Sequence, residues 1–79
     1  MSITREIIEG DIIKNEIKSS NIKYSEYDTT KKTMKVIFNN DKTYVYLDVP
    51  HSEYTKFRLS ESQGKYFSSN ISRKYKYEK

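Results

Sequence analysis

The chain has 79 residues, a formal net charge of +4 at pH 7, eight tyrosines, no tryptophan and no cysteine. This length supports a single small core, and the lack of cysteine excludes disulfides, thiolate nucleophiles and cysteine-based zinc sites. The N-terminus has no hydrophobic leader and apolar stretches are short, so we expect a cytoplasmic protein without a membrane span.

The positive charge is concentrated toward the C-terminal end. Residues 1–16 contain two basic and four acidic side chains, a net of −2, whereas residues 17–79 contain 13 basic and 7 acidic ones, a net of +6. A basic region of this kind attracts polyanions such as nucleic acids. The alternative interpretation is a lysine-rich solvated surface without a ligand.

The first fourteen residues do not predict one element. Their isoleucines would surround a helix instead of forming one stripe, and the Gly10-Asp11 pair also suits a turn between two extended pieces. We treat residues 1–14 as a poorly defined N-terminal extension. An edge strand is expected over Ile12–Lys18.

Three further strands are predicted as an antiparallel meander. The first covers residues 22–27, and the second, 34–38, alternates apolar and other side chains with the period of a half-buried strand. The polar residues 39–42 suit a hairpin turn, and residues 43–49 are rich in β-branched and aromatic side chains. Because both faces of this last strand are apolar, it is expected at the centre of the sheet.

Two short helices are predicted after Pro50, which ends the last strand because it lacks the N–H that a sheet ladder needs. The first covers residues 51–59. The order Ser60-Glu61-Ser62-Gln63 matches a capping box in which Ser60 and Gln63 start the second helix. Gly64 costs a helix about 1 kcal/mol relative to Ala, which suggests close approach of a tyrosine ring or the sheet backbone. The predicted fold class is α+β, an antiparallel three- to four-stranded meander followed by two short helices packed on one face.

No catalytic constellation is predicted from the residue types and their spacing. His51 is the sole imidazole and is interpreted as the start of a helix, because no partner suggests a general base. The acidic residues lack metal-ligand spacing, and the two glycines form no phosphate-binding loop. We therefore expect a non-enzyme without metal or cofactor.

Tyrosines next to basic side chains suggest binding of RNA or single-stranded nucleic acid. A tyrosine ring serves either as a core side chain or as a stacking face for a base, and nearby lysines would contact phosphates. The stacking interpretation requires Tyr44 and Tyr46 to face solvent. If the helices cover them, the basic C-terminal tail remains as the candidate. The candidate nucleic-acid-binding residues are Tyr44, Tyr46, Lys35, Lys42, Arg73, Lys74, Tyr75 and Lys76.

A protein-interaction module is the second hypothesis. The first 17 residues contain six isoleucines, more than a small domain is expected to bury, and exposed apolar surface often marks a partner. The strand expected over Ile12–Lys18 would form a homodimer by sheet extension, or the surface would dock on a host protein if the chain is phage-encoded. The candidate interface residues are Ile7, Ile8, Ile12 and Ile13.

Several short motifs follow one another through most of the chain: Ile17-Lys18-Ser19-Ser20-Asn21-Ile22, Tyr27-Asp28, Tyr44-Val45-Tyr46, Val49-Pro50, and Glu61 to Phe67 with Asn70-Ile71 and Tyr75. With these motifs the chain resembles the KTSC domain family from about Ile17 to Tyr77. It departs from the family at Glu61, often Ala, and at Asn40-Asp41, where the hairpin often has a glycine. The family is named for the C-terminus of some lysyl-tRNA synthetases, which implies RNA binding as a hypothesis, since a fold does not fix a function. Residues 15–79 are thus expected to form a KTSC-like domain.

Overall fold

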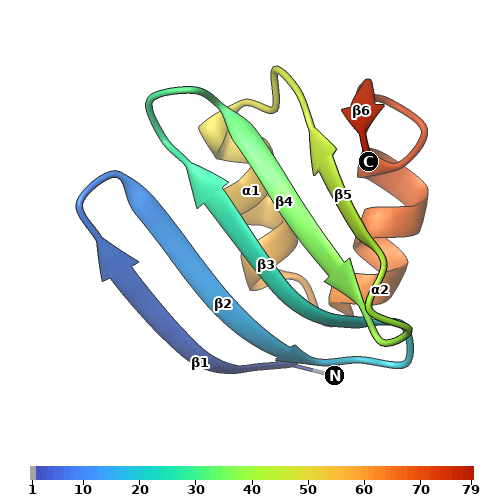
Figure 1. The fold of residues 1–79 in the computed structure, drawn as a ribbon. Coiled ribbons are helices and arrows are strands. Elements are labelled where there is room, and N and C mark those ends of the chain that lie inside the picture. Colours follow the sequence, from blue (N-terminus) through green and yellow to red (C-terminus); the bar gives the residue numbers. More distant parts are fainter. Residues whose placement is uncertain (1) are drawn as a thin grey trace.

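The structure, a computed structural model, describes residues 2–79 as one antiparallel sheet with helices on one face (Figure 1). The six strands lie in chain order across the sheet, so the predicted α+β meander is confirmed with a higher strand count than predicted. The strands are β1 (Ser2–Glu9), β2 (Ile12–Lys18), β3 (Ile22–Asp28), β4 (Thr33–Phe38), β5 (Thr43–Tyr46) and β6 (Tyr77–Glu78).

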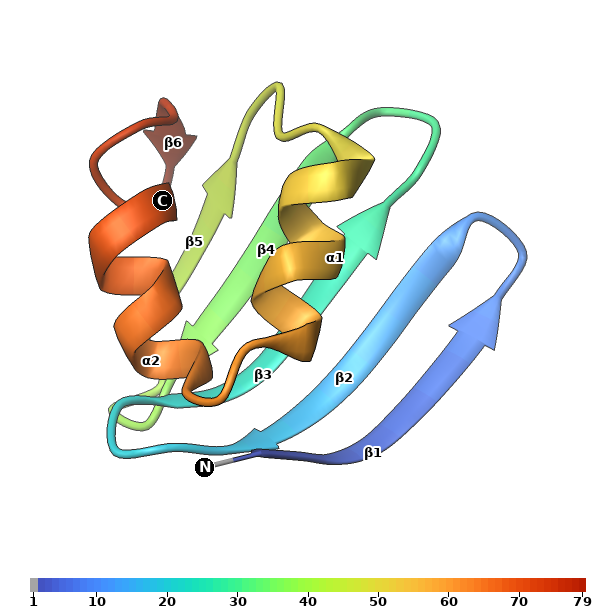
Figure 2. The same ribbon diagram turned by 180° about the vertical axis from the view of Figure 1, so that it is seen from behind.

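The helices lie between β5 and β6 in the chain. They are α1 (His51–Leu59) and α2 (Gln63–Tyr66), and α2 continues into a π-helix, η1 (Phe67–Ile71). Figure 2 shows both helical segments on the same side of the sheet, with β1 lying beyond them. The prediction that the helices pack on one face is therefore confirmed. None of the helices in residues 2–79 is long and apolar enough to cross a membrane.

The N-terminal residues form a hairpin in the same sheet. β1 pairs with β2 from Ser2 opposite Lys18 to Glu9 opposite Ile12. Gly10 occupies the turn with a φ of +57°, a conformation that glycine adopts without steric cost. The strand predicted over Ile12–Lys18 is present, but the prediction that it lies at the edge of the sheet is wrong, because β1 pairs with it on its outer side.

The hydrophobic core lies between the sheet and the helices. Met34 and Val36 of β4 are fully buried, whereas Lys35 between them points to the other face, as the alternating pattern predicts. The buried hydrophobic side chains are Ile13, Ile17, Ile22, Tyr27, Met34, Val36, Tyr46, Val49, Tyr54, Phe57, Phe67 and Ile71. We refer to the two faces of the sheet as the helix-covered face and the outer face.

β5 is not the central strand that its two apolar faces predicted. It is the fifth strand of six and ends at Tyr46. Asp48 then adopts a φ of +54°, and Val49 is buried beyond the end of the strand, where its N–H donates to the carbonyl of Lys32 at 2.9 Å. Part of the apolar character of residues 43–49 thus comes from a buried loop and not from a second covered sheet face.

The connection between the helices differs from the predicted capping box. Ser62 is the N-cap of α2, and its hydroxyl accepts a hydrogen bond from the Lys65 N–H at 3.3 Å. Ser60 and Gln63 instead bond to carbonyl groups at the end of α1 and in the connection. The second of two serines, Ser62, therefore caps α2, because the Ser60 hydroxyl donates to the Phe57 carbonyl at the end of α1.

A buried polar network links the N-terminal hairpin to α1. The Tyr54 hydroxyl lies 2.8 Å from Asn15 Oδ1 and 2.9 Å from Ser25 Oγ. Asn15 Nδ2 donates to the Glu6 carboxylate at 3.1 Å, and Arg58 forms an ion pair with the same carboxylate at 3.0 Å. Since Asn15 and Ser25 are fully buried, these bonds satisfy groups that would otherwise be costly to desolvate.

Candidate nucleic-acid interface

The two tyrosines of β5 lie on the helix-covered face. Tyr46 is 3% exposed, and its ring meets the edge of Phe67 at a centroid distance of 5.3 Å. Burial raises the pKa of the Tyr46 hydroxyl to about 12. The prediction of a water-facing pair is therefore wrong for Tyr46, because the helices cover this part of the strand.

Tyr44 lies near the end of the sheet and is half-buried. Its ring contacts Phe38 edge-on at a centroid distance of 5.5 Å and lies tilted against Tyr77 at 5.0 Å. Lys79 Nζ is 5.5 Å from the centroid of the Tyr44 ring, which is cation–π geometry. Tyr77 is 48% exposed, so this corner presents an accessible ring close to the Lys79 ammonium.

An open hollow of about 520 Å³ lies beside Tyr44. We refer to it as the Tyr44 hollow. One wall is aromatic, and the remainder carries hydroxyl, amide and ammonium groups. The hydroxyl and amide groups can donate hydrogen bonds to a polar ligand and accept them from it, and the ammonium group can donate them. Its lining residues are Ser20, Asn21, Phe38, Asn39, Asn40, Lys42 and Tyr44.

A second open hollow of about 440 Å³ shares Ser20 and Asn21 with the first and continues along α2. Gly64 lies in its wall, where a Cβ would clash with Asn21 Oδ1 and lie 2.7 Å from Ser19 Oγ. The predicted close approach at Gly64 is confirmed, but the neighbour is the β2–β3 turn and not a tyrosine ring or the sheet backbone. Glycine therefore lets α2 pack against the turn that separates the two hollows.

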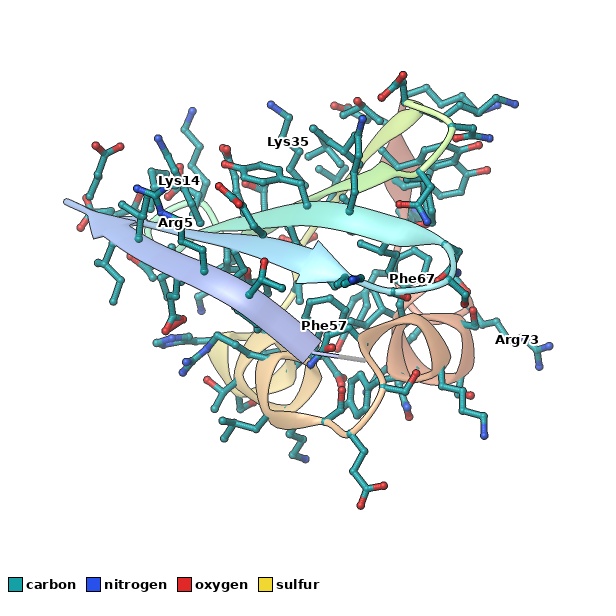
Figure 3. The ribbon with its side chains drawn as sticks, turned by 90° about the horizontal axis from the view of Figure 1, so that it is seen from below. Arg5, Lys14, Lys35, Phe57, Phe67 and Arg73 are labelled. Atoms are coloured by element: carbon teal, nitrogen blue, oxygen red, sulfur yellow. The ribbon has the colours of Figure 1, made fainter. Side chains whose placement is uncertain are left out.

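The predicted basic residues do not form one surface. Figure 3 shows Lys35 on the outer face, together with Arg5 and Lys14, whereas Arg73 lies on the helix-covered side and projects sideways from the C-terminal helical segment. Of the predicted cations, Lys42 lines the Tyr44 hollow. The exposed Lys76 precedes β6, and its carbonyl accepts from the Leu47 N–H after β5 at 2.8 Å.

Lys74 and Tyr75 have a structural role that the sequence did not indicate. Both bond to the buried carboxylate of Glu53, Lys74 Nζ at 3.3 Å and the Tyr75 hydroxyl at 2.9 Å. The Tyr66 hydroxyl also donates to Glu53. Burial opposes ionisation of Glu53, but these hydrogen bonds outweigh it and hold the pKa of the carboxyl below its usual value. The cluster fastens the C-terminal segment to α1.

The N-terminal isoleucines proposed as a protein interface are divided between environments. Ile13 belongs to the core at 8% exposure, Ile7 and Ile12 are half-buried on the outer face, and Ile8 is 65% exposed. They therefore do not form one apolar patch.

His51 is the first residue of α1, as the sequence predicted. Its ring stacks on Tyr27 at a centroid distance of 5.6 Å. Within residues 2–79, no three His, Asp or Glu side chains gather in a group that would hold a metal ion. The residue that sequence reasoning missed is Tyr77, although the Tyr-Lys-Tyr order near the C-terminus was visible.

Comparison with known proteins gives the family. A family model described as KTSC domain matches residues 18–75, which includes β3, β4, β5 and all the helices. The crystal structure of a KTSC domain protein from Yersinia pestis is similar, with a TM-score of 0.81 and 28% sequence identity, covering 86% of this chain and 96% of that one. No curated protein matches the chain. From the matched segment and the shared fold we conclude that this chain belongs to the KTSC domain family.

Proposed function

We propose that the chain is a small non-enzymatic module that binds RNA or single-stranded nucleic acid at the Tyr44 hollow. The observation that supports this function is that Tyr44, which lines the hollow together with Lys42, also contacts the exposed Tyr77 ring and the Lys79 ammonium. No cofactor is needed, and a cytoplasmic location stays a prediction.

Base stacking would supply most of the affinity. An accessible aromatic ring contributes roughly 1–3 kcal/mol per stacked base. Tyr77 has the more exposed ring, and the Tyr44 ring packs against it at a centroid distance of 5.0 Å. Stacking of this kind requires unstacked bases, which favours single strands over a duplex.

Polar groups around the rings would complete the interaction. The Nδ2 groups of Asn21 and Asn40 would donate to base edges, since their Oδ1 atoms already accept from the Ser19 hydroxyl at 3.0 Å and the Lys42 N–H at 3.2 Å. The ammonium of Lys42 would contact a phosphate. Asn39 lies in the same wall, but its amide already donates to the Ser19 carbonyl at 3.1 Å. With so few cations in place, binding is expected to be weak and strongly salt-dependent.

Fluorescence anisotropy with a labelled single-stranded RNA tests the proposal through two matched pairs of variants. Lys42→Ala should weaken binding and lower the slope of log affinity against log salt by roughly 0.7, the value for one phosphate contact. Lys35→Ala removes the same charge from the outer face and should leave binding unchanged. Tyr77→Ala should weaken binding by about tenfold, and Tyr24→Ala, which removes an outer-face ring, should not.

Two results would contradict the proposal. One is the absence of any binding at low salt. The other is an equal loss of affinity in Lys42→Ala and Lys35→Ala, since it would show diffuse attraction of a polyanion by net charge without a site.

A further inference from the structure

β1 leaves one side of the sheet open. β1 pairs with β2 on one side, without interruption from Arg5 to Glu9 and with an irregularity between Ile3 and Arg5, and no strand within residues 2–79 pairs with the other side (Figure 1). The strand contains no proline, and the described helices do not cover its outer edge (Figure 2). A long unprotected edge of this kind is a template for pairing with another strand.

The side chains of β1 differ between the two faces of the sheet. Arg5, Ile7 and Glu9 are opposite outer-face residues of β2 and therefore lie on the outer face. Glu6 and Ile8 are opposite the buried Asn15 and Ile13 and lie on the helix-covered side. Residues directly opposite one another in an antiparallel pair share a face, so this assignment limits which pairings are possible.

We propose that β1 pairs antiparallel with β1 of a second copy of this chain, in a register centred on Ile7. A twofold axis perpendicular to the sheet then joins two sheets into one continuous sheet with a single outer face. In this register Ile7 contacts its own copy on the outer face. Arg5 of each chain lies opposite Glu9 of the other, so two ion pairs flank the isoleucine contact.

Charge distinguishes this register from its neighbours. Centring on Arg5 would place two guanidinium groups directly opposite one another, and centring on Glu6 would do the same with two carboxylates. Like charges in directly opposed positions destabilise a strand pair. Centring on Ile8 would place Ile7 opposite Glu9 and remove both ion pairs. Of these four registers, only the one centred on Ile7 places oppositely charged residues of β1 across from each other and also keeps an isoleucine contact.

The existing contacts of the strand are compatible with this pairing. Glu9 forms an ion pair with Lys14 of its own hairpin at 2.6 Å, and the guanidinium of the second copy would approach from the open side. Pairing would also place Ile8, 65% exposed in the single chain, opposite Glu6 of the second copy and beside the new strand. An apolar side chain that is costly to expose would thereby lose contact with water.

A single cysteine tests the geometry, because the natural chain has none. Residues opposite one another in a non-hydrogen-bonded antiparallel pair have Cα atoms about 4.5 Å apart, within reach of a disulfide. Ile7→Cys should therefore form a covalent dimer under mild oxidation. Ile12→Cys is the matched control: it is also half-buried on the outer face, but it lies on β2, one strand away from the new contact, and should form no covalent dimer.

Charge reversal tests the register. Arg5→Glu alone and Glu9→Arg alone should each weaken dimerisation by about tenfold in sedimentation velocity, because each places like charges opposite one another. A mixture of the two variants should form a heterodimer, since one chain is then acidic and the other basic at the two positions. A folding defect would not be rescued by mixing.

Three outcomes would overturn the proposal. Sedimentation of the full chain only as a monomer at all concentrations would show that β1 does not pair with a second copy. Equal cross-linking of Ile7→Cys and Ile12→Cys would show unspecific collision, and dimerisation unaffected by charge reversal would show another interface. None of these measurements involves nucleic acid, so they are independent of the proposed function.

Discussion

The two edges of the sheet differ in the length of the edge strand and in the side chains that it carries. The N-terminal edge is an eight-residue strand, β1, with which no other strand within residues 2–79 pairs on its open side and whose outer face carries Arg5, Ile7 and Glu9 in turn. The C-terminal edge is a two-residue strand, β6, that brings Tyr77 onto Tyr44 and is held near α1 by the Glu53 cluster. The long edge is the one proposed to pair with another strand, whereas the short edge carries the rings and the ammonium group of the proposed nucleic-acid site.

The difference shows why tyrosine beside lysine is an ambiguous signal. Tyr44 and Tyr46 lie on the same face of the same strand, two residues apart, yet only Tyr46 lies beneath η1 and is almost completely buried. Tyr75 and Tyr77 differ in the same way, one bonded to Glu53 and the other exposed. In each pair, the role of the ring depends on whether a helix supplies a side chain that contacts it, Phe67 for Tyr46 and Glu53 for Tyr75.

The largest expected effect comes from Phe67, which supports the C-terminal edge by contacting both Phe38 and Tyr46. Phe67→Ala should lower the free energy of unfolding by about 3–5 kcal/mol, because it leaves a cavity beneath β5. Leu59→Ala, at 72% exposure, is the control and should change stability by less than about 0.5 kcal/mol. Urea denaturation measures both, and equal effects would contradict the core described above.

At the opposite edge, Asn15→Ala should lower the free energy of unfolding by about 1–3 kcal/mol. The substitution leaves the buried Tyr54 hydroxyl without one of its two partners and removes the hydrogen bond to Glu6. Hydrogen exchange should show faster opening of β1 and β2 than of β4. Uniform acceleration across the sheet would show instead that the network stabilises the whole domain.

The C-terminal edge should respond to acid through Glu53. Because its folded pKa lies below the usual 4.5, its contribution to stability is present above about pH 4.5 and is lost as the pH falls through the folded pKa. The melting temperature of the natural chain should therefore fall as the pH is lowered through this range, and the fall should be smaller in Glu53→Gln. An unchanged pH dependence in the variant would assign acid sensitivity to other carboxylates.

The smallest expected effect concerns the turn that forms the N-terminal hairpin. Gly10→Ala should cost about 1 kcal/mol, since the φ of +57° strains an L side chain although no atom lies within 4 Å of the added Cβ. Gly10→Asn should cost less, because asparagine tolerates this conformation. If the two variants melt at the same temperature, backbone strain does not explain the glycine.

Local patterns predicted much of the middle of the chain. The alternation at residues 34–38 identified β4 and its buried face, and Pro50 marked the start of α1. The polar residues after β4 form the predicted turn, where Asp41 has a φ of +68°. These features could be predicted because they depend on side chains and backbone preferences within a few residues of one another.

Other features required partners distant in the chain. An irregularity between Ile22 and Tyr24 in the β3–β4 pairing changes the alternation, so Ile22, Ser25 and Tyr27 are buried while Tyr24 faces outward. Such a shift cannot be seen in a single strand because it exists only relative to its neighbour. The position of β6 beside β5 has the same origin, since 30 residues separate Tyr46 from Tyr77 in the paired strands.

The amino-acid sequence by itself determined the meander, the two helical segments after Pro50 and the membership in the KTSC family. Only the tertiary structure decided which face of β5 the helices cover, which strand forms the open edge and which tyrosines remain accessible. The physical reason is that period and propensity specify where a side chain points along its own strand. Whether another layer covers that side depends on contacts between residues far apart in the chain.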